Sequence, residues 1–266
     1  MIISVINMSN GAVPDAELQR AIRAVNRQIA EDFTPYWGFG SQLRLEGKTG
    51  HSKSKSPIDP SDMRGDAILD LRDFVSVTDA NGYHDRHFSG IPYGIVFLEL
   101  SKKLMEDWTV TLSHEALELT GDPENSLLVQ GPHPRKPRER VFHWFEMCDA
   151  VQEETYEIDH VAVSNFVLPL YFTSSNERGG RNDFLGTITK EGKTLRSFSV
   201  NPGGYIGFFD PAENDDVTWS LDDDPKAKRR LEDKRALKTG RGLRRHLHEH
   251  WTNLQEDSHD QESMGD

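Results

Sequence analysis

The chain has 266 residues and a formal net charge of −13, so it can bury a sizeable core, and its charge argues against general binding to nucleic acid. Its one cysteine, Cys148, allows no intramolecular disulfide, which fits a reducing compartment. No apolar run is long enough to span a bilayer, and the apolar start lacks the basic flank of a signal peptide. We therefore expect a cytoplasmic location, no membrane partner and no nucleic acid.

The first third of the chain alternates predicted strands with a helix. Met1–Met8 is predicted as a buried strand, and Pro14 and Asp15 suit the first turn of a helix. Five apolar residues then recur with helical spacing: Leu18, Ile22, Val25, Ile29 and Phe33. Pro35 is expected to end this helix. Residues 46–66 are rich in Gly, Ser, Lys, Pro and Asp and are predicted to form an exposed loop.

Two further strands are predicted before the middle of the chain, at residues 67–77 and at Pro92–Leu100. The second leads directly into a predicted helix at Trp108–Gly121. An extended peptide could add to such a strand by backbone pairing. An ordinary core strand is an equally good interpretation.

The predicted helix carries the strongest functional signal, the sequence His-Glu-Ala-Leu-Glu at residues 114–118. His114 and Glu118 are four residues apart and share one helix face, with Glu115 beside them. This is the arrangement of the H-E-x-x-H zinc-peptidase motif, with Glu118 replacing the second histidine. A carboxylate can also bind zinc, and Glu115 could polarise a water held by the ion.

A solvated helix face is the alternative interpretation, because Glu is common in helices. The surrounding residues Val110, Leu112, Leu117 and Leu119 are apolar, so the motif forms a polar island on a helix expected to be buried. Buried glutamate is rare unless it is paired or bound to a metal. Gly121 and the Asp122–Pro123 pair are expected to end the helix in an extended exit.

The second half of the chain is predicted to be richer in strands. Val141–Asp149 places Glu146 and Asp149 in an aromatic-rich segment, and His160–Phe172 is strand-like. A hairpin is expected from Phe184–Thr189 and Leu195–Val200, followed by a strand at Ile206–Phe209. From Glu213 onward charge dominates. We therefore predict a domain at residues 1–212 and a charged tail at 213–266 that is disordered or partly helical.

From about Met1 to Asp210 the chain resembles zinc-dependent metallopeptidases of the zincin type, in particular a group of bacterial and phage proteins. The residues that carry the resemblance are Ser113–Glu118, Phe145–Asp149, Phe166–Pro169 and Pro202–Tyr205. The resemblance implies an α+β fold with a mixed sheet packed on the active-site helix, additional C-terminal strands, a bound Zn²⁺ and hydrolysis of a peptide or protein substrate. It also makes a virion-associated location an alternative to a cytoplasmic one.

The third metal ligand is open between two patterns of that family. In the first, Glu146 from a downstream segment is the ligand, and Asp149 orients His114. In the second, Gly121 ends the helix and Glu124 is the ligand, with Met147 beneath the ion. Asp122 is a further candidate, although it could simply cap the helix exit. We favour Glu146, since an unpaired carboxylate in an aromatic segment would be costly.

Roles follow from this arrangement. Glu115 would be the general base, and a nearby hydroxyl would stabilise the oxyanion; Tyr156, Tyr171 and Tyr205 are the candidates, with aromatic packing as their alternative role. One histidine and two carboxylates form an oxygen-rich set, so other divalent ions could replace zinc. Two other classes remain open: a catalytically inactive zincin-like binding or virion-associated structural protein, and a metal-free hydrogen-bond network around His114.

Overall fold

The computed structural model describes residues 1–46, 65–73, 91–173, 180–190, 192–221, 224–225 and 227–229. Most of the expected loop at 46–66 lies outside the described residues, as do residues 74–77 of a predicted strand and the tail beyond residue 229. Within the described part, no helix is both long and apolar enough to cross a bilayer.

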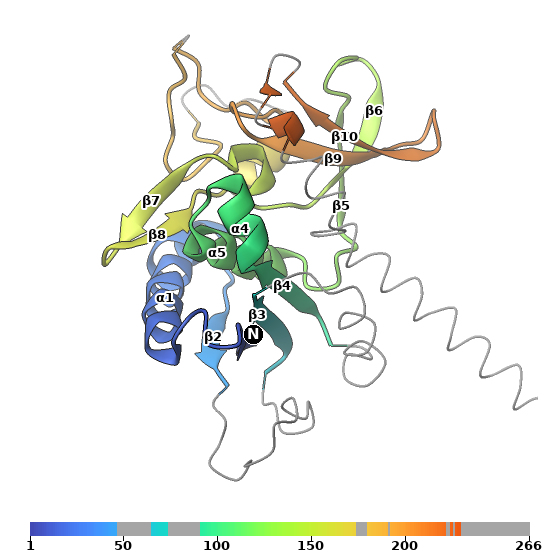
Figure 1. Ribbon diagram of the computed structural model, residues 1–266. Helices are drawn as coiled ribbons and strands as arrows, with labels where there is room; N and C mark the ends of the chain where they lie inside the picture. Colours follow the sequence, from blue (N-terminus) through green and yellow to red (C-terminus); the bar gives the residue numbers. More distant parts are fainter. Residues whose placement is uncertain are drawn as a thin grey trace, which may run out of the picture.

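A four-stranded parallel sheet forms the first half of the fold (Figure 1). Its strand order is β2-β1-β3-β4, and the strands are β1 (Ile2–Met8), β2 (Gln42–Leu45), β3 (Ala67–Arg72) and β4 (Tyr93–Phe97). All three strand pairings are parallel. Every residue of β3 is buried, as is typical of a central strand in a parallel sheet.

The α+β class is therefore confirmed. Among the described strands no sheet is mixed: the sheet of β1 to β4 is parallel in every pairing, and the antiparallel pairs belong to two separate sheets. The motif helix packs against strands of both kinds, namely β3 and β4 of the parallel sheet and β8 (Val161–Ser164) of an antiparallel pair. Parallel neighbours need crossover connections, and α1 makes the one between β1 and β2.

The predicted first helix is confirmed as α1 (Asp15–Arg27), and its apolar positions are buried. It runs on without a break through a π-helical turn, η1 (Gln28–Phe33), into α2 (Thr34–Trp37). Pro35 does not end it, because this proline occupies the first turn of α2, where a missing N–H is tolerated. The helix ends at Gly38, whose φ of +74° suits glycine and whose N–H donates to the Thr34 carbonyl.

Two helices follow β4. The predicted strand Pro92–Leu100 is too long: β4 stops at Phe97, and α4 (Leu98–Leu104) begins there. The motif helix is confirmed as α5 (Trp108–Gly121), and Asp107 caps it by accepting a hydrogen bond from the Thr109 N–H. α5 packs against β3, β4, α1 and β8, and Figure 1 shows it near the centre of the molecule.

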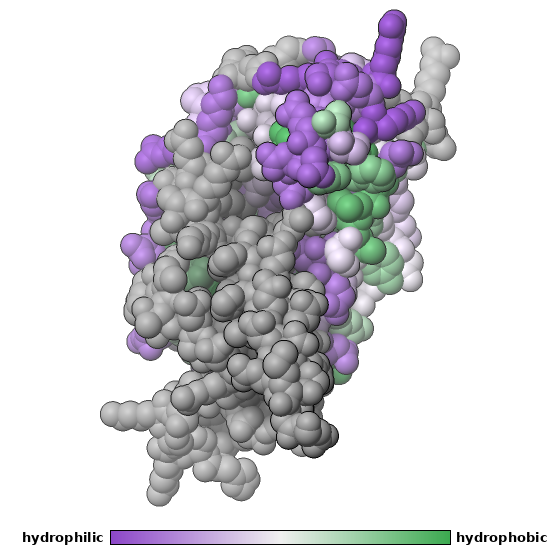
Figure 2. All heavy atoms as spheres, turned by 90° about the vertical axis from the view of Figure 1, so that its right-hand side faces the viewer, coloured by the Kyte–Doolittle hydropathy of each residue, from purple (hydrophilic) through white to green (hydrophobic). Residues whose placement is uncertain are grey.

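The antiparallel half contains a four-stranded sheet of order β10-β9-β6-β5 and a separate hairpin. The sheet strands are β5 (Leu128–Pro132), β6 (Arg140–Trp144), β9 (Tyr205–Asp210) and β10 (Asp215–Ser220); the hairpin strands are β7 (Thr155–Ile158) and β8 (Val161–Ser164). Figure 2 shows hydrophilic side chains gathered at the top of the molecule, the level of β6, β9 and β10 in Figure 1. Charged side chains protect exposed sheet edges from further pairing.

Three expectations in this half need correction. Residues 215–220, assigned to the charged tail, form β10 and pair along the whole of β9. The hairpin at 184–200 has no strands among the described residues, although the Thr189 N–H donates to the Lys193 carbonyl, at 2.8 Å. The strand-like segment after His160 is shorter than expected: β8 ends at Ser164, and Pro169 opens a short 3₁₀ helix, η4 (Pro169–Phe172).

Candidate metal centre

The motif residues lie on a helix that is buried on nearly every side. His114, Glu115 and Glu118 are only 2%, 8% and 4% exposed, and Leu112 and Leu117 are fully buried. The predicted polar island is confirmed, and the alternative of a solvated helix face is wrong. Charged groups in such surroundings require partners or a bound ion.

A second set of carboxylates reaches the same place from the segment between β6 and the 3₁₀ helix η3 (Asp149–Val151). Glu146 and Asp149 are each 8% exposed. Between them, Met147 packs against the end of α5 so closely that a Cβ on Gly121 would lie 2.2 Å from its Cε. The missing side chain of Gly121 thus lets this segment approach the motif helix.

His114 joins the two segments. Its Nε2 lies 2.9 Å from Glu118 Oε1 and 3.3 Å from Asp149 Oδ1. Two groups of ligand atoms lie within 4.8 Å of one another, namely His114 with Glu115 and Glu118, and Glu118 with Glu146 and Asp149. Either group could hold a metal ion. Glu118 belongs to both, whereas His114 and Glu146 belong to different groups.

The charge state of His114 is set by competing effects. Burial lowers its pKa, but the Glu118 and Asp149 carboxylates outweigh burial and raise the pKa to about 10. Without an ion, His114 is therefore protonated and paired with both carboxylates at neutral pH. A metal must displace this proton, because a ligating imidazole is neutral.

The residues present fit a divalent cation. The Nδ1 atom of His114 is buried and has no hydrogen-bond partner in the part of the chain that the structure describes. Buried polar atoms are normally hydrogen-bonded, so this nitrogen is an exception, while Nε2 on the other side of the ring faces the Glu118 and Asp149 carboxylates that would share an ion with it. Imidazole and carboxylate together suit zinc and also harder ions such as Mn²⁺.

Of the three candidate oxyanion donors, the structure brings Tyr205 to the cluster. Burial, followed by the charge of Asp149 and a hydrogen bond with it, holds the Tyr205 pKa well above its usual range. The Tyr156 hydroxyl donates instead to Asp32, at 2.7 Å, and the Tyr171 hydroxyl donates to the Ser199 carbonyl, at 2.8 Å. These two hydroxyls are engaged in holding the fold together.

The alternative third ligands lie outside both groups. The Asp122 carboxylate accepts hydrogen bonds from the backbone N–H of Ser126 and Leu127, at 3.1 and 2.9 Å, so it shapes the exit from α5. Glu124 is exposed. Asp149 does contact His114, as expected for a residue that orients it.

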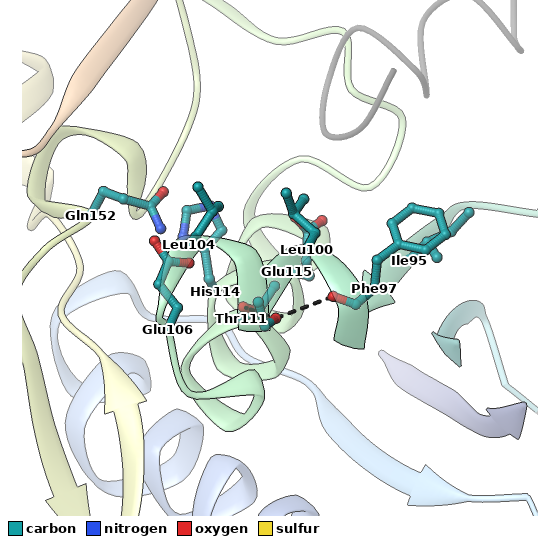
Figure 3. Close-up of a pocket in the computed structure, with 10 residues that line it drawn as sticks. Ile95, Phe97, Leu100, Leu104, Glu106, Thr111, His114, Glu115 and Gln152 are labelled. Atoms are coloured by element: carbon teal, nitrogen blue, oxygen red, sulfur yellow. Dashed lines mark hydrogen bonds between the residues drawn. The ribbon is translucent and has the colours of Figure 1, made fainter. Parts of the chain in front are cut away.

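The cluster is bordered by two pockets. The first is lined by His114 and Glu115, by Gln152 at the end of η3, and by residues from β4, α4 and the following loop (Figure 3): Ile95, Phe97, Leu100, Leu104 and Glu106. The second is lined by Glu146 and Asp149 together with mainly aromatic side chains: His143, Trp144, Tyr171, Phe172 and Ile206. Sequence reasoning missed Glu106 and Gln152, which belong to no motif and reach the pocket only through the fold.

Comparison of the chain with protein-family models, with curated proteins and with solved structures found no match. The fold and the site define an α+β protein whose central helix carries a buried cluster of histidine and carboxylates that could hold a metal ion.

Proposed function

We propose that this protein is a metal-dependent hydrolase, with Zn²⁺ as the expected ion and a peptide or protein as the substrate. The observation that carries the proposal is the buried convergence of His114, Glu115 and Glu118 with Glu146 and Asp149. These residues come from two segments that the fold brings together. Histidine plus carboxylates around a pocket is the chemistry that metal-assisted hydrolysis requires.

Each residue has a role that follows from its contacts. His114 and Glu118 would hold the ion with Glu146, and Asp149, which lies against His114, would orient the ring. When bound, the ion would acidify a water molecule and polarise the substrate carbonyl. Glu115 would take the proton of the attacking water and deliver it to the leaving amine. Tyr205, adjacent to Asp149, would donate to the developing oxyanion.

The placement of β4 supports an extended peptide as the substrate. Among the described strands, β4 is at one edge of the parallel sheet. Its residues Ile95 and Phe97 line the pocket of His114 and Glu115. A Cβ on Gly94 would lie 3.5 Å from Glu115 Oε2, so this carboxylate lies directly beside the strand. A peptide paired along β4 would pass the proposed general base.

One observation favours a different function. His114 already pairs with two carboxylates, and such a closed network could serve the fold alone, without a metal. A catalytically inactive metal-binding or virion-associated protein would differ from the enzyme only by lacking hydrolysis.

Metal content distinguishes these functions. Protein purified without an affinity tag should contain a divalent ion, and His114→Ala should lose it. Glu124→Gln changes an exposed acidic residue just after α5. It is the matched control and should keep the ion. No ion in the wild-type protein, together with unchanged melting in chelator, would leave only the structural network. If the ion is present, Glu115→Gln should fold but not cleave a peptide library, and equal cleavage by this variant would reject the proposed base.

A further inference from the structure

We propose that the cluster holds two divalent cations and that the carboxylate of Glu118 is shared between them. One half of the centre is His114, Glu115 and Glu118; the other half is Glu118, Glu146 and Asp149. This inference rests on the proposed function, because it presumes that a first ion binds beside His114 and Glu118. Glu146 and Asp149 would then serve the second ion instead of completing the set around the first.

The two groups of ligand atoms have a geometry that suits two ions. In each, the three ligand atoms lie within 4.8 Å of one another, and among the described residues Glu118 is the one member common to both. A carboxylate has two oxygens and can give one to each of two ions. Two-metal centres in hydrolytic enzymes hold their ions about 3.5–4 Å apart, a separation that a shared carboxylate can bridge.

The two halves of the centre border different pockets. His114 and Glu115 line one pocket, whereas Glu146 and Asp149 line the other. Glu118 is 4% exposed and lines neither. Each half therefore has its own adjacent space, and the shared residue is enclosed in the protein.

His114 distinguishes this centre from a simple cluster of carboxylates. Its side chain is almost fully buried; Nε2 faces Glu118 and Asp149, and Nδ1 has no hydrogen-bond partner within the described ranges. Nε2 is therefore the ring nitrogen that could bind an ion between Glu118 and Asp149 once its proton is displaced. The ring also borders the pocket of Glu115, so it contacts both halves of the centre.

The number of bound ions tests the inference. The metal-free full-length chain is titrated with Zn²⁺, and bound ions are counted by native mass spectrometry and by calorimetry. We expect two ions per chain in the wild-type protein and in the control Glu124→Gln. We expect one ion in Glu146→Gln, because Glu146 belongs only to the second half, whereas Asp149 also contacts His114.

The outcomes separate the two proposals. Two ions in the wild-type protein support the inference. One ion overturns it but leaves the proposed hydrolase standing, and no ion overturns both. If Glu146→Gln does not fold, the wild-type titration still decides the number of sites.

Electron paramagnetic resonance with Mn²⁺ tests the bridge itself. A first equivalent should give the signal of an isolated ion, and a second should weaken this signal through magnetic coupling across Glu118. Two ions with simply additive signals would show that no carboxylate links them, and the shared centre would be rejected.

Discussion

Acidification should destabilise the protein through His143, a histidine in the wall of the second pocket. This ring is 2% exposed, and its Nε2 donates to the Pro132 carbonyl at 2.9 Å. It packs against Phe198 and Phe208, with ring centroids 4.7 and 5.6 Å away. Burial lowers its pKa from 6.5 to about 4, partly opposed by the hydrogen bond to Pro132.

The sign and size of the effect follow from linkage. The unfolded chain binds a proton at His143 below about pH 6.5, but the folded protein binds it only near pH 4. The stabilising contribution of the neutral ring is therefore complete above pH 6.5 and is lost as the pH falls toward 4. A shift of this size corresponds to about 3.5 kcal/mol, at about 1.4 kcal/mol per pKa unit.

The assay is urea unfolding between pH 7.5 and 4.5, in chelator so that loss of a metal does not contribute. The variant His143→Gln removes the titration, and the difference between its pH profile and that of the wild-type protein isolates the histidine. The wild-type protein should lose more stability over this range than the variant does. Parallel profiles would refute the reasoning that burial keeps this ring neutral.

Three further predictions concern the cluster and its surroundings. The Cys148 thiol is fully buried, and burial and then the charge of Glu118 raise its pKa. It should therefore react with thiol reagents only when the protein unfolds, and rapid labelling of the folded protein would contradict this. Gly121→Ala should lower the free energy of unfolding by roughly 1–3 kcal/mol in chemical denaturation, because the buried Met147 side chain would have to move. An unchanged free energy would show that the Met147 side chain moves freely. Zn²⁺ binding at pH 8 should release about one proton from His114, and the affinity for Zn²⁺ should rise with pH up to about pH 10. Calorimetry in buffers of different ionisation enthalpy measures the number of protons released. No release would mean that the His114 ring is not a ligand.

Local patterns in the sequence predicted the elements whose own residues carry a clear apolar pattern. The helical spacing from Leu18 to Phe33 marks α1 and η1, and the apolar run at the start marks β1. The prediction that Pro35 ends the helix was wrong because proline can start a new turn as well as stop an old one. β10 was not predicted, because the segment was judged by its charged composition. Its half-buried Val217 and Trp219 in fact alternate with exposed acidic and polar residues, which is the pattern of a strand.

The candidate site, like the fold, could be predicted only in part from the sequence. The spacing of His114, Glu115 and Glu118 is a local property of one helix, and it predicted their shared position. The approach of Glu146 and Asp149 depends on packing between segments about 30 residues apart, through the contact of Met147 with Gly121. Composition suggested Glu146, but no spacing rule could show that Glu118, and not His114, is the residue that the two groups share.

The replacement of histidine by Glu118 acquires a physical reason if two ions bind. A histidine at this position would present one ring nitrogen to the site, since its second nitrogen is directed away from the first. A carboxylate has two oxygens on one carbon, and both can be directed into the same enclosed space. Glu118 contacts His114 on its own helix and is grouped with Glu146 and Asp149 of the other segment. The residue that weakens the match to a one-ion motif is therefore the residue that a shared centre requires.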